Sequence, residues 1–193
     1  MSISHEFSFD WFSAHIPKFQ KYLGHLRGRP CAVIEIGAHE GRSTTWLLDN
    51  ILTHENSRII TIDFSVQPPF WRNIEASNGL QKTQLFVGLS GEILRRLPLA
   101  SADFVYIDGS HGTPDVLEDA VLSFRLLKCG GVMAFDDYLW DEPKWGREGY
   151  PKPAVDAFLD AYKARLELLE KTYQVWIRKL NEQPAPPNQP MEA

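Results

Sequence analysis

The feature of this sequence that most constrains its fold is a regular alternation of short β-branched runs with segments of helical periodicity. The expected strands are residues 32–37, 58–64, 83–88, 103–108, 132–136 and 172–178. The expected helices are residues 9–26, 43–54, 71–77, 91–97, 114–128 and 154–170. Strands that alternate with helices pair in parallel, and right-handed crossovers place helices on both faces of the sheet. The sequence therefore predicts an α/β fold with a doubly wound, mostly parallel sheet.

The ends of two helices carry further expectations. Thr113 can cap the helix that begins at Pro114, and Gly130 with Gly131 can stop it. After the long helix at 154–170, only residues 172–178 are predicted to form a strand. Either one strand of the sheet is missing or a loop supplies it. A sheet that lacks an edge strand has unpaired backbone groups, which favours assembly into a homo-oligomer.

Length and charge limit the class of protein. The 193 residues fit a single domain over 1–180, followed by a disordered tail over 181–193, which contains four prolines. The net charge of -5 repels phosphate backbones, so no nucleic-acid partner is expected. No apolar run approaches the roughly 20 residues that cross a bilayer, so no membrane partner is expected. Cys31 and Cys129 are predicted to be buried, reduced thiols. With no signal peptide in view, they favour a cytoplasmic location.

A glycine turn follows the first predicted strand, where doubly wound sheets bind ligands. Gly37 and Gly41 permit a tight turn and a close backbone approach to a ligand. The dinucleotide fingerprint GxGxxG is absent, because position 39 is histidine. The turn therefore suits an uncharged or cationic group, and Glu35 suits an amino or sulfonium group. The alternative is an ordinary turn without a ligand. The candidate binding residues are Glu35, Gly37, Ala38, Gly41 and Ser43.

Two residues extend this site toward a nucleoside. Asp63 ends the second predicted strand, 22 residues after Gly41. An acid at this place accepts hydrogen bonds from ribose hydroxyls in nucleotide sites. Its alternative is a solvated acid at a strand end. Gly88 ends the third strand, where its backbone can flank an adenine ring.

Three acids end the next two strands. Asp108 ends the fourth strand, and Asp136 and Asp137 end the fifth. Such neighbours repel one another unless a cation lies among them, and oxygen ligands favour Mg²⁺ or Ca²⁺. A bound Mg²⁺ lowers the pKa of a substrate hydroxyl. The alternative is that these acids cap helices or bind a ligand without metal.

These motifs resemble those of a known family. The glycine turn with Asp63 resembles the cofactor motifs of class I S-adenosylmethionine-dependent methyltransferases. Residues 106–111, 126–132 and 135–140 resemble the small metal-dependent O-methyltransferases of the catechol, caffeoyl-coenzyme A and sugar types. The resemblance runs from about residue 32 to 140. It implies a Rossmann-like fold and a methyltransferase that acts on a hydroxyl of a small molecule.

The resemblance also implies roles for the acids. It places Asp108 in the cofactor site and in catalysis, and it implies that Asp108, Asp136 and Asp137 hold Mg²⁺. His111 stands where the catechol-type relatives carry a lysine general base. An imidazole titrates near neutral pH and can take a hydroxyl proton, but a positioning or purely structural role is also consistent with the sequence.

Several alternatives stay open at this stage. The aromatic residues Trp71, Tyr138, Trp140 and Trp145 are expected to form a lid over a small substrate or to pack in the core. The function can also be a metal-independent N- or O-methyltransferase, or a non-catalytic partner subunit that binds the nucleoside. A nicotinamide-dependent oxidoreductase is disfavoured, because the phosphate-binding fingerprint is absent.

Overall fold

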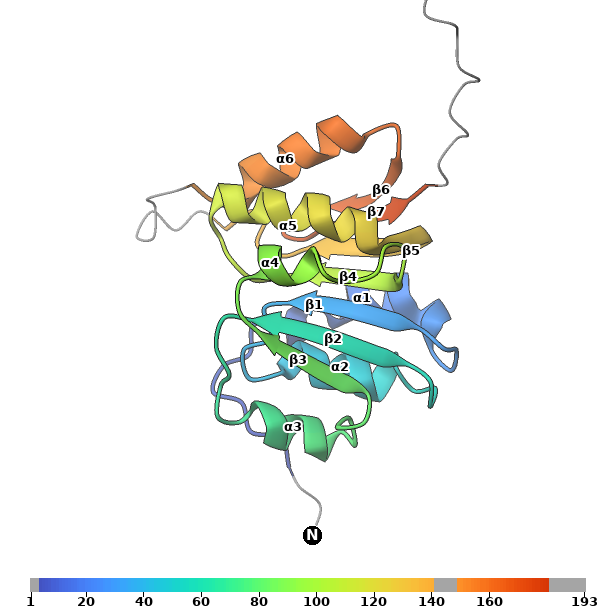
Figure 1. Cartoon of the computed structure of the whole chain (residues 1–193), viewed down its shortest axis with the longest axis vertical. Helices are drawn as coiled ribbons and strands as arrows, with labels where there is room; N and C mark the ends of the chain where they lie inside the picture. The colour runs from blue at the N-terminus through green and yellow to red at the C-terminus, as the bar shows by residue number, and fades with distance from the viewer. Residues whose placement is uncertain (1–3, 141–148, 181–193) are drawn as a thin grey trace, which may run out of the picture.

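A seven-stranded sheet organises the chain, which we describe from a computed structural model over residues 4–140 and 149–180 (Figure 1). The strands are β1 (Ala32–Ile36), β2 (Arg58–Asp63), β3 (Thr83–Val87), β4 (Ala102–Ile107), β5 (Leu127–Phe135), β6 (Leu166–Lys171) and β7 (Val175–Lys179). Their order is β3-β2-β1-β4-β5-β7-β6. The first five strands are parallel, and β7 is antiparallel to both β5 and β6. The predicted fold class is confirmed.

Helices cover both faces of this sheet. They are α1 (Ile16–Leu23), α2 (Arg42–Asn50), α3 (Phe70–Ala76), α4 (Ser90–Leu94), α5 (Thr113–Leu126) and α6 (Pro151–Tyr162), with short 3₁₀ helices η1 (Ser13–His15) and η2 (Gly24–Leu26) beside α1. In Figure 1, α4, α5 and α6 lie in front of the sheet, and α1 and α2 lie behind it. The strand order reverses between β1 and β4, so the switch point where such folds bind ligands lies at the carboxyl ends of these two strands.

The core divides into two layers because side chains alternate along each strand. Ile34 and Val105 belong to the layer with α5 and α6, whereas Val33 and Phe104 belong to the layer with α1 and α2. Trp176 of β7 is fully buried in the second layer, against Phe19 and Phe104. Both faces of the central strands are therefore buried, which fits their continuous apolar runs.

The C-terminal edge differs from the sequence prediction. The last helix ends at Tyr162, and Leu166–Lys171 form β6, which pairs antiparallel with β7. The leucines at 166 and 169 follow helical spacing in the sequence, but hydrogen bonding to β7 fixes this stretch as a strand. The hairpin of β6 and β7 completes this edge of the sheet, so the alternative of a missing strand does not hold. The homo-oligomer stays a prediction.

Three helix boundaries also differ. Gly112, not Thr113, takes the capping position of α5, and the Thr113 hydroxyl instead donates to the carbonyl of Tyr150 at 2.9 Å. Gly130 and Gly131 do not stop α5, because that helix ends at Leu126 and both glycines lie within β5. The predicted helix at 9–26 is shorter: α1 begins at Ile16 with Pro17 in its first turn, and 3₁₀ turns flank it.

The cysteine prediction is half right. Cys31 is buried beside Ser57, but Cys129 is exposed near the beginning of β5. In the described part of the chain, no helix is long and apolar enough to cross a membrane. The predicted tail at 181–193 and Trp145 lie outside the described residues.

Candidate active site

The carboxyl ends of β1 and β4 meet at Gly37. This residue has a φ of +88°, and a Cβ added to it would lie 1.8 Å from the carbonyl oxygen of Asp108. Only glycine fits here, since any side chain would collide with backbone. The close approach predicted for this glycine is therefore made to the neighbouring strand end, and it brings the turn against Asp108.

Asp63 holds the glycine turn in place. Its Oδ2 accepts hydrogen bonds from the amides of Ala38 and His39, each at 2.9 Å, and its Oδ1 accepts from the amide of Ser65 at 3.1 Å. Gly41, with a φ of +81°, then leads into α2. The predicted ribose acid thus lies directly beside the turn. Each carboxylate oxygen can accept two hydrogen bonds, so Oδ1 keeps capacity for a hydroxyl donor.

Glu35 is buried below the turn. Its two oxygens accept hydrogen bonds from the hydroxyls of Ser43 and Thr44, each at 2.5 Å. Burial raises the pKa of Glu35 to about 7, although the two hydroxyls oppose this shift. The carboxyl therefore anchors the first turn of α2 to β1, and the Ser43 hydroxyl is one of the two groups that it holds. The structure places both residues under the turn, where they support it.

Gly88 joins the same edge from β3. Its amide donates to the carbonyl of Asp63 at 2.9 Å, so the two predicted nucleoside residues are neighbours. The turn, Asp63, Gly88 and Asp108 consequently lie along one rim of the sheet. The cofactor residues predicted from separate strands are brought together.

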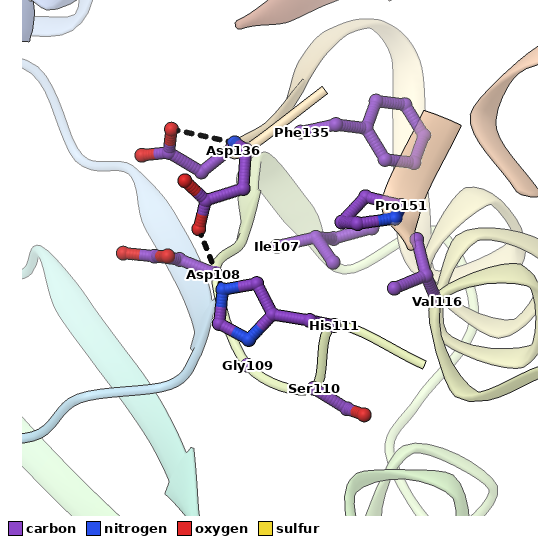
Figure 2. A pocket seen from close by; sticks show the side chains of 10 residues that line it. Ile107, Asp108, Gly109, Ser110, His111, Val116, Phe135, Asp136 and Pro151 are labelled. Carbon is purple, nitrogen blue, oxygen red and sulfur yellow. Dashed lines mark hydrogen bonds and ion pairs between the residues drawn. The ribbon is translucent and has the colours of Figure 1, made fainter. Parts of the chain in front are cut away.

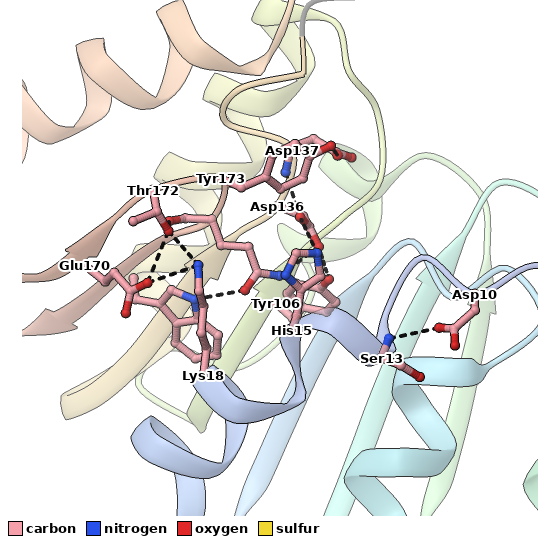
Figure 3. A network of polar contacts seen from close by, with 12 residues as sticks. Asp10, Ser13, His15, Lys18, Tyr106, Asp136, Asp137, Glu170, Thr172 and Tyr173 are labelled. Carbon is pink, nitrogen blue, oxygen red and sulfur yellow. Dashed lines mark hydrogen bonds and ion pairs between the residues drawn. The ribbon is translucent and has the colours of Figure 1, made fainter.

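The acids beyond β4 and β5 form the second half of the rim. Asp136 accepts hydrogen bonds from the Tyr106 hydroxyl, from Gln174 Nε2 at 2.9 Å and from the amide of Asp137 at 2.8 Å. Asp137 has a φ of +56°, and its Oδ1 accepts from the Tyr173 hydroxyl at 2.7 Å. Figure 3 shows these contacts around Asp136 and Asp137.

Burial and mutual repulsion perturb these acids. Burial raises the pKa of Asp108 well above its usual range, and the charges of Asp136 and Asp137 add to the effect. Burial and the charge of Asp137 raise the pKa of Asp136. Burial also acts on Asp137, but hydrogen bonds from His111 and Tyr173 outweigh it and lower the pKa of that carboxyl. Asp137 is therefore the acid most firmly held in its charged form.

The acids do not fit a metal ion as they are arranged. Asp136 and Asp137 each use both carboxylate oxygens on donors of the protein. Within residues 4–140 and 149–180, no group of three or more acidic, histidine or cysteine side chains could hold a metal ion. A divalent ion at Asp137 would have to share each carboxylate oxygen with His111 or Tyr173, or displace them.

His111 faces a small hollow at this rim (Figure 2). Its Nε2 lies 2.9 Å from Asp137 Oδ2, and its ring lies 4.3 Å from that of Trp140. In the described part of the chain, no hydrogen bond engages its Nδ1. Apolar side chains line the hollow opposite the acids: Ile107, Val116, Phe135 and Pro151. The arrangement is an imidazole that a carboxylate orients from one side and that can exchange a proton on the other.

The sequence did not point to two residues of this site. His15, from η1, lies with its Nε2 3.9 Å from Asp136 Oδ1, and its ring stacks on Tyr173 at 5.8 Å. Tyr173 lies in the turn between β6 and β7. Both are distant in sequence from the acids and belong to no motif, so only the tertiary structure shows them.

The aromatic residues predicted to form a lid lie in different environments. Trp140 packs on His111 at the rim, whereas Tyr138 is buried and donates its hydroxyl to Asp156 at 2.9 Å. Trp71 is partly exposed and packs edge-on against Phe70. Of the three, only Trp140 therefore contacts a predicted catalytic residue.

This fold and rim define a class of protein. Class I S-adenosylmethionine-dependent methyltransferases typically combine a doubly wound sheet with a glycine turn after the first strand, an acid after the next strand and further acids across the switch point. A family model described as a methyltransferase domain matches residues 34–138, more than half of the chain. The chain therefore belongs to this methyltransferase-domain family, and the resemblance to class I methyltransferases predicted from the sequence is confirmed.

Similar proteins support this membership. A protein of Mycobacterium sp. (strain JLS) that bears the name O-methyltransferase is 37% identical over 107 residues, which cover 53% of this chain and 46% of that protein. The chain thus spans about half the length of the curated relatives it matches.

Solved structures share the fold. An O-methyltransferase from Bacillus cereus in complex with SAH has a TM-score of 0.68 at 19% identity and covers 89% of this chain and 84% of its own. MycE methyltransferase from the mycinamycin biosynthetic pathway, in complex with Mg and SAH, has a TM-score of 0.68 at 17% identity and covers 93% of this chain and 53% of its own.

Proposed function

We propose that this chain transfers a methyl group from S-adenosylmethionine to a hydroxyl of a small molecule, with His111 as the general base. The observation that carries the proposal is the pairing of His111 with Asp137 beside Asp108, which itself lies against Gly37 of the cofactor turn. A proton acceptor and the predicted cofactor site therefore share one rim.

The residues of the rim have separate roles in an in-line displacement. S-adenosylmethionine supplies a methyl group on a sulfonium when it is bound. The turn at residues 37–41 and Asp63 would hold the nucleoside, and the positive charge of a bound donor would favour the charged form of Asp108 against the burial that raises its pKa. Asp137 orients the His111 ring and keeps Nε2 protonated, so that Nδ1 would accept the proton of the acceptor hydroxyl. The methyl–sulfur bond would break as the new oxygen–carbon bond forms, and S-adenosylhomocysteine would leave. The hollow beside His111 would border the acceptor.

A divalent cation is the second candidate for activating the hydroxyl. The observation in its favour is the crowding of three acids, which raises the pKa of Asp108 and Asp136. MycE contains Mg in its structure. Against it, Asp137 is held by His111 and Tyr173. We therefore propose that catalysis proceeds without the metal. We also propose that the partner is a small-molecule acceptor, that neither nucleic acid nor a membrane is a partner, and that the protein acts in the cytoplasm.

The test combines binding and turnover. Calorimetry measures the affinity of the purified chain for S-adenosylmethionine, and transfer of a labelled methyl group to a panel of phenols and sugars measures activity, with and without EDTA. We expect micromolar binding and O-methylation that EDTA leaves unchanged. Activity that EDTA abolishes and Mg²⁺ restores would support the cation. Binding without any turnover would point to the nucleoside-binding subunit, and no binding would overturn the proposal.

A further inference from the structure

The cofactor turn, residues 37–41, has a backbone conformation that needs support from outside the turn. Gly37 and Gly41 have φ values of +88° and +81°, and His39 between them has a φ of +45°. A side chain strains the backbone in this left-handed region, because its Cβ crowds the following carbonyl. A turn of this kind persists only where contacts from the rest of the fold hold it.

One of these contacts comes from the N-terminal segment, residues 5–15. Asp63 holds two amides of the turn, but the side chain of Glu40 is held by Ser8. Glu40 Oε2 accepts a hydrogen bond from the Ser8 amide and Oε1 accepts one from the Ser8 hydroxyl, each at 2.7 Å. Glu40 is only 7% exposed, so both oxygens of a buried carboxylate are occupied by one residue from 32 positions earlier in the chain. We call this pair the latch.

Further contacts hold the segment on both sides of the latch. Asn73 of α3 is fully buried, and its Nδ2 donates to the carbonyls of Glu6 and Glu40 at 2.9 and 2.8 Å. Its Oδ1 accepts from the amide of Glu6 at 2.7 Å. On the other side, Asp10 pairs with Arg42, the first residue of α2, at 2.6 Å. These contacts join the same two pieces of chain, so the segment and the turn are ordered together.

We propose that Glu40 is a positioning residue for S-adenosylmethionine, and that its latch with Ser8 makes the N-terminal segment part of the donor site. The inference deepens the proposed function and rests on its assignment of the turn to the nucleoside. Glu40 acts through the turn, because the closed latch holds residues 37–41 in the shape that binds the donor. When the latch is open, the turn relaxes, and donor binding is weakened by the free energy of reordering it.

Closure of the latch and binding of the donor are therefore coupled, and such coupling is reciprocal. If opening the latch weakens donor binding about tenfold, bound donor must disfavour opening by the same factor. The Ser8 amide reports this opening, because it exchanges its hydrogen with water when its bond to Glu40 breaks. A contact that serves stability alone would exchange at the same rate with and without the ligand.

Calorimetry with S-adenosylhomocysteine on the full chain measures the effect of the latch on affinity. We expect Glu40→Ala to weaken binding about tenfold. Ser8→Ala changes an exposed residue and keeps the amide bond, so it should weaken binding about threefold. Glu40→Gln should bind within about twofold of wild type, because its amide oxygen accepts from the Ser8 amide and its Nε2 donates to the Ser8 hydroxyl. An equal loss in Glu40→Gln and Glu40→Ala would show that the charge acts directly and would overturn the positioning role.

Amide hydrogen exchange at Ser8, followed by NMR with and without saturating S-adenosylhomocysteine, measures the reverse effect. We expect the ligand to slow this exchange about tenfold in the wild-type chain. Exchange that the ligand leaves unchanged would overturn the inference, as would wild-type affinity of Glu40→Ala.

Glu167→Ala is the matched control. Glu167 accepts from Arg178 at 2.7 Å in β6, at the far edge of the sheet from the turn, so its loss should leave the affinity for S-adenosylhomocysteine unchanged. A loss equal to that of Glu40→Ala would overturn the inference. Failure of the wild-type chain to bind S-adenosylhomocysteine would instead overturn the proposed function, so the two failures are distinguishable.

Discussion

Replacing Glu35 with glutamine should remove a pH dependence of stability that the wild-type chain carries. Glu35 is fully buried, and its pKa in the folded state is about 7 against an ordinary value of 4.5. Between these values the unfolded chain releases the proton while the folded chain keeps it. The free energy of unfolding therefore falls as the pH rises through this window and is fully reduced above pH 7.

The size of the effect follows from the two pKa values. A difference of one pKa unit corresponds to about 1.36 kcal/mol, so the full effect is about 3 kcal/mol. Between pH 5 and pH 8, about 2.5 kcal/mol of it is expressed. Glutamine has the same shape and stays neutral. Its amide can accept from one of the Ser43 and Thr44 hydroxyls and donate to the other, because a hydroxyl serves in either role.

Urea unfolding followed by circular dichroism, at pH 5 and pH 8 without cofactor, measures this effect. The stability of Glu35→Gln relative to wild type should rise by about 2.5 kcal/mol from pH 5 to pH 8. Other acids affect both proteins equally and cancel in the difference. Glu55→Gln, at an exposed glutamate, is the control and should show a constant difference. If the difference for Glu35→Gln is also the same at both pH values, Glu35 is charged throughout and the reasoning is wrong.

Three further outcomes are expected. Gly28→Ala should lower the free energy of unfolding by only about 1–2 kcal/mol, the strain of its φ of +75°, because nothing lies within 4 Å of the added Cβ. Gly37→Ala should lower it by roughly 3 kcal/mol or more, because its Cβ collides with Asp108. Equal urea midpoints for the two variants would refute this. Asp137→Asn should lower kcat by about 10²–10⁴ with cofactor affinity preserved, as steady-state kinetics and calorimetry would show; an unchanged kcat would exclude the His111–Asp137 pair as the base. Asp63→Asn should weaken S-adenosylmethionine binding by about tenfold in calorimetry, and unaltered affinity would remove Asp63 from the nucleoside site.

The sequence by itself determined the central sheet and the rim of the site. Runs such as 32–36 and 102–107 are mostly apolar, which is typical of strands buried on both faces. Because parallel strands have their carboxyl ends at one edge, the position of Asp63, Asp108 and Asp136 at strand ends was enough to place them together. These signals are local: each depends on a few consecutive residues.

Only the tertiary structure decided the rest. The stretch Leu166–Lys171 has helical spacing but becomes a strand through its pairing with β7, and Gly130 is accommodated within β5. His15 and Asp136, 121 residues apart in sequence, become neighbours because α1 packs behind the sheet. Backbone pairing and burial join residues that are distant in the chain, so the energies that settle these positions are absent from any local pattern of residues.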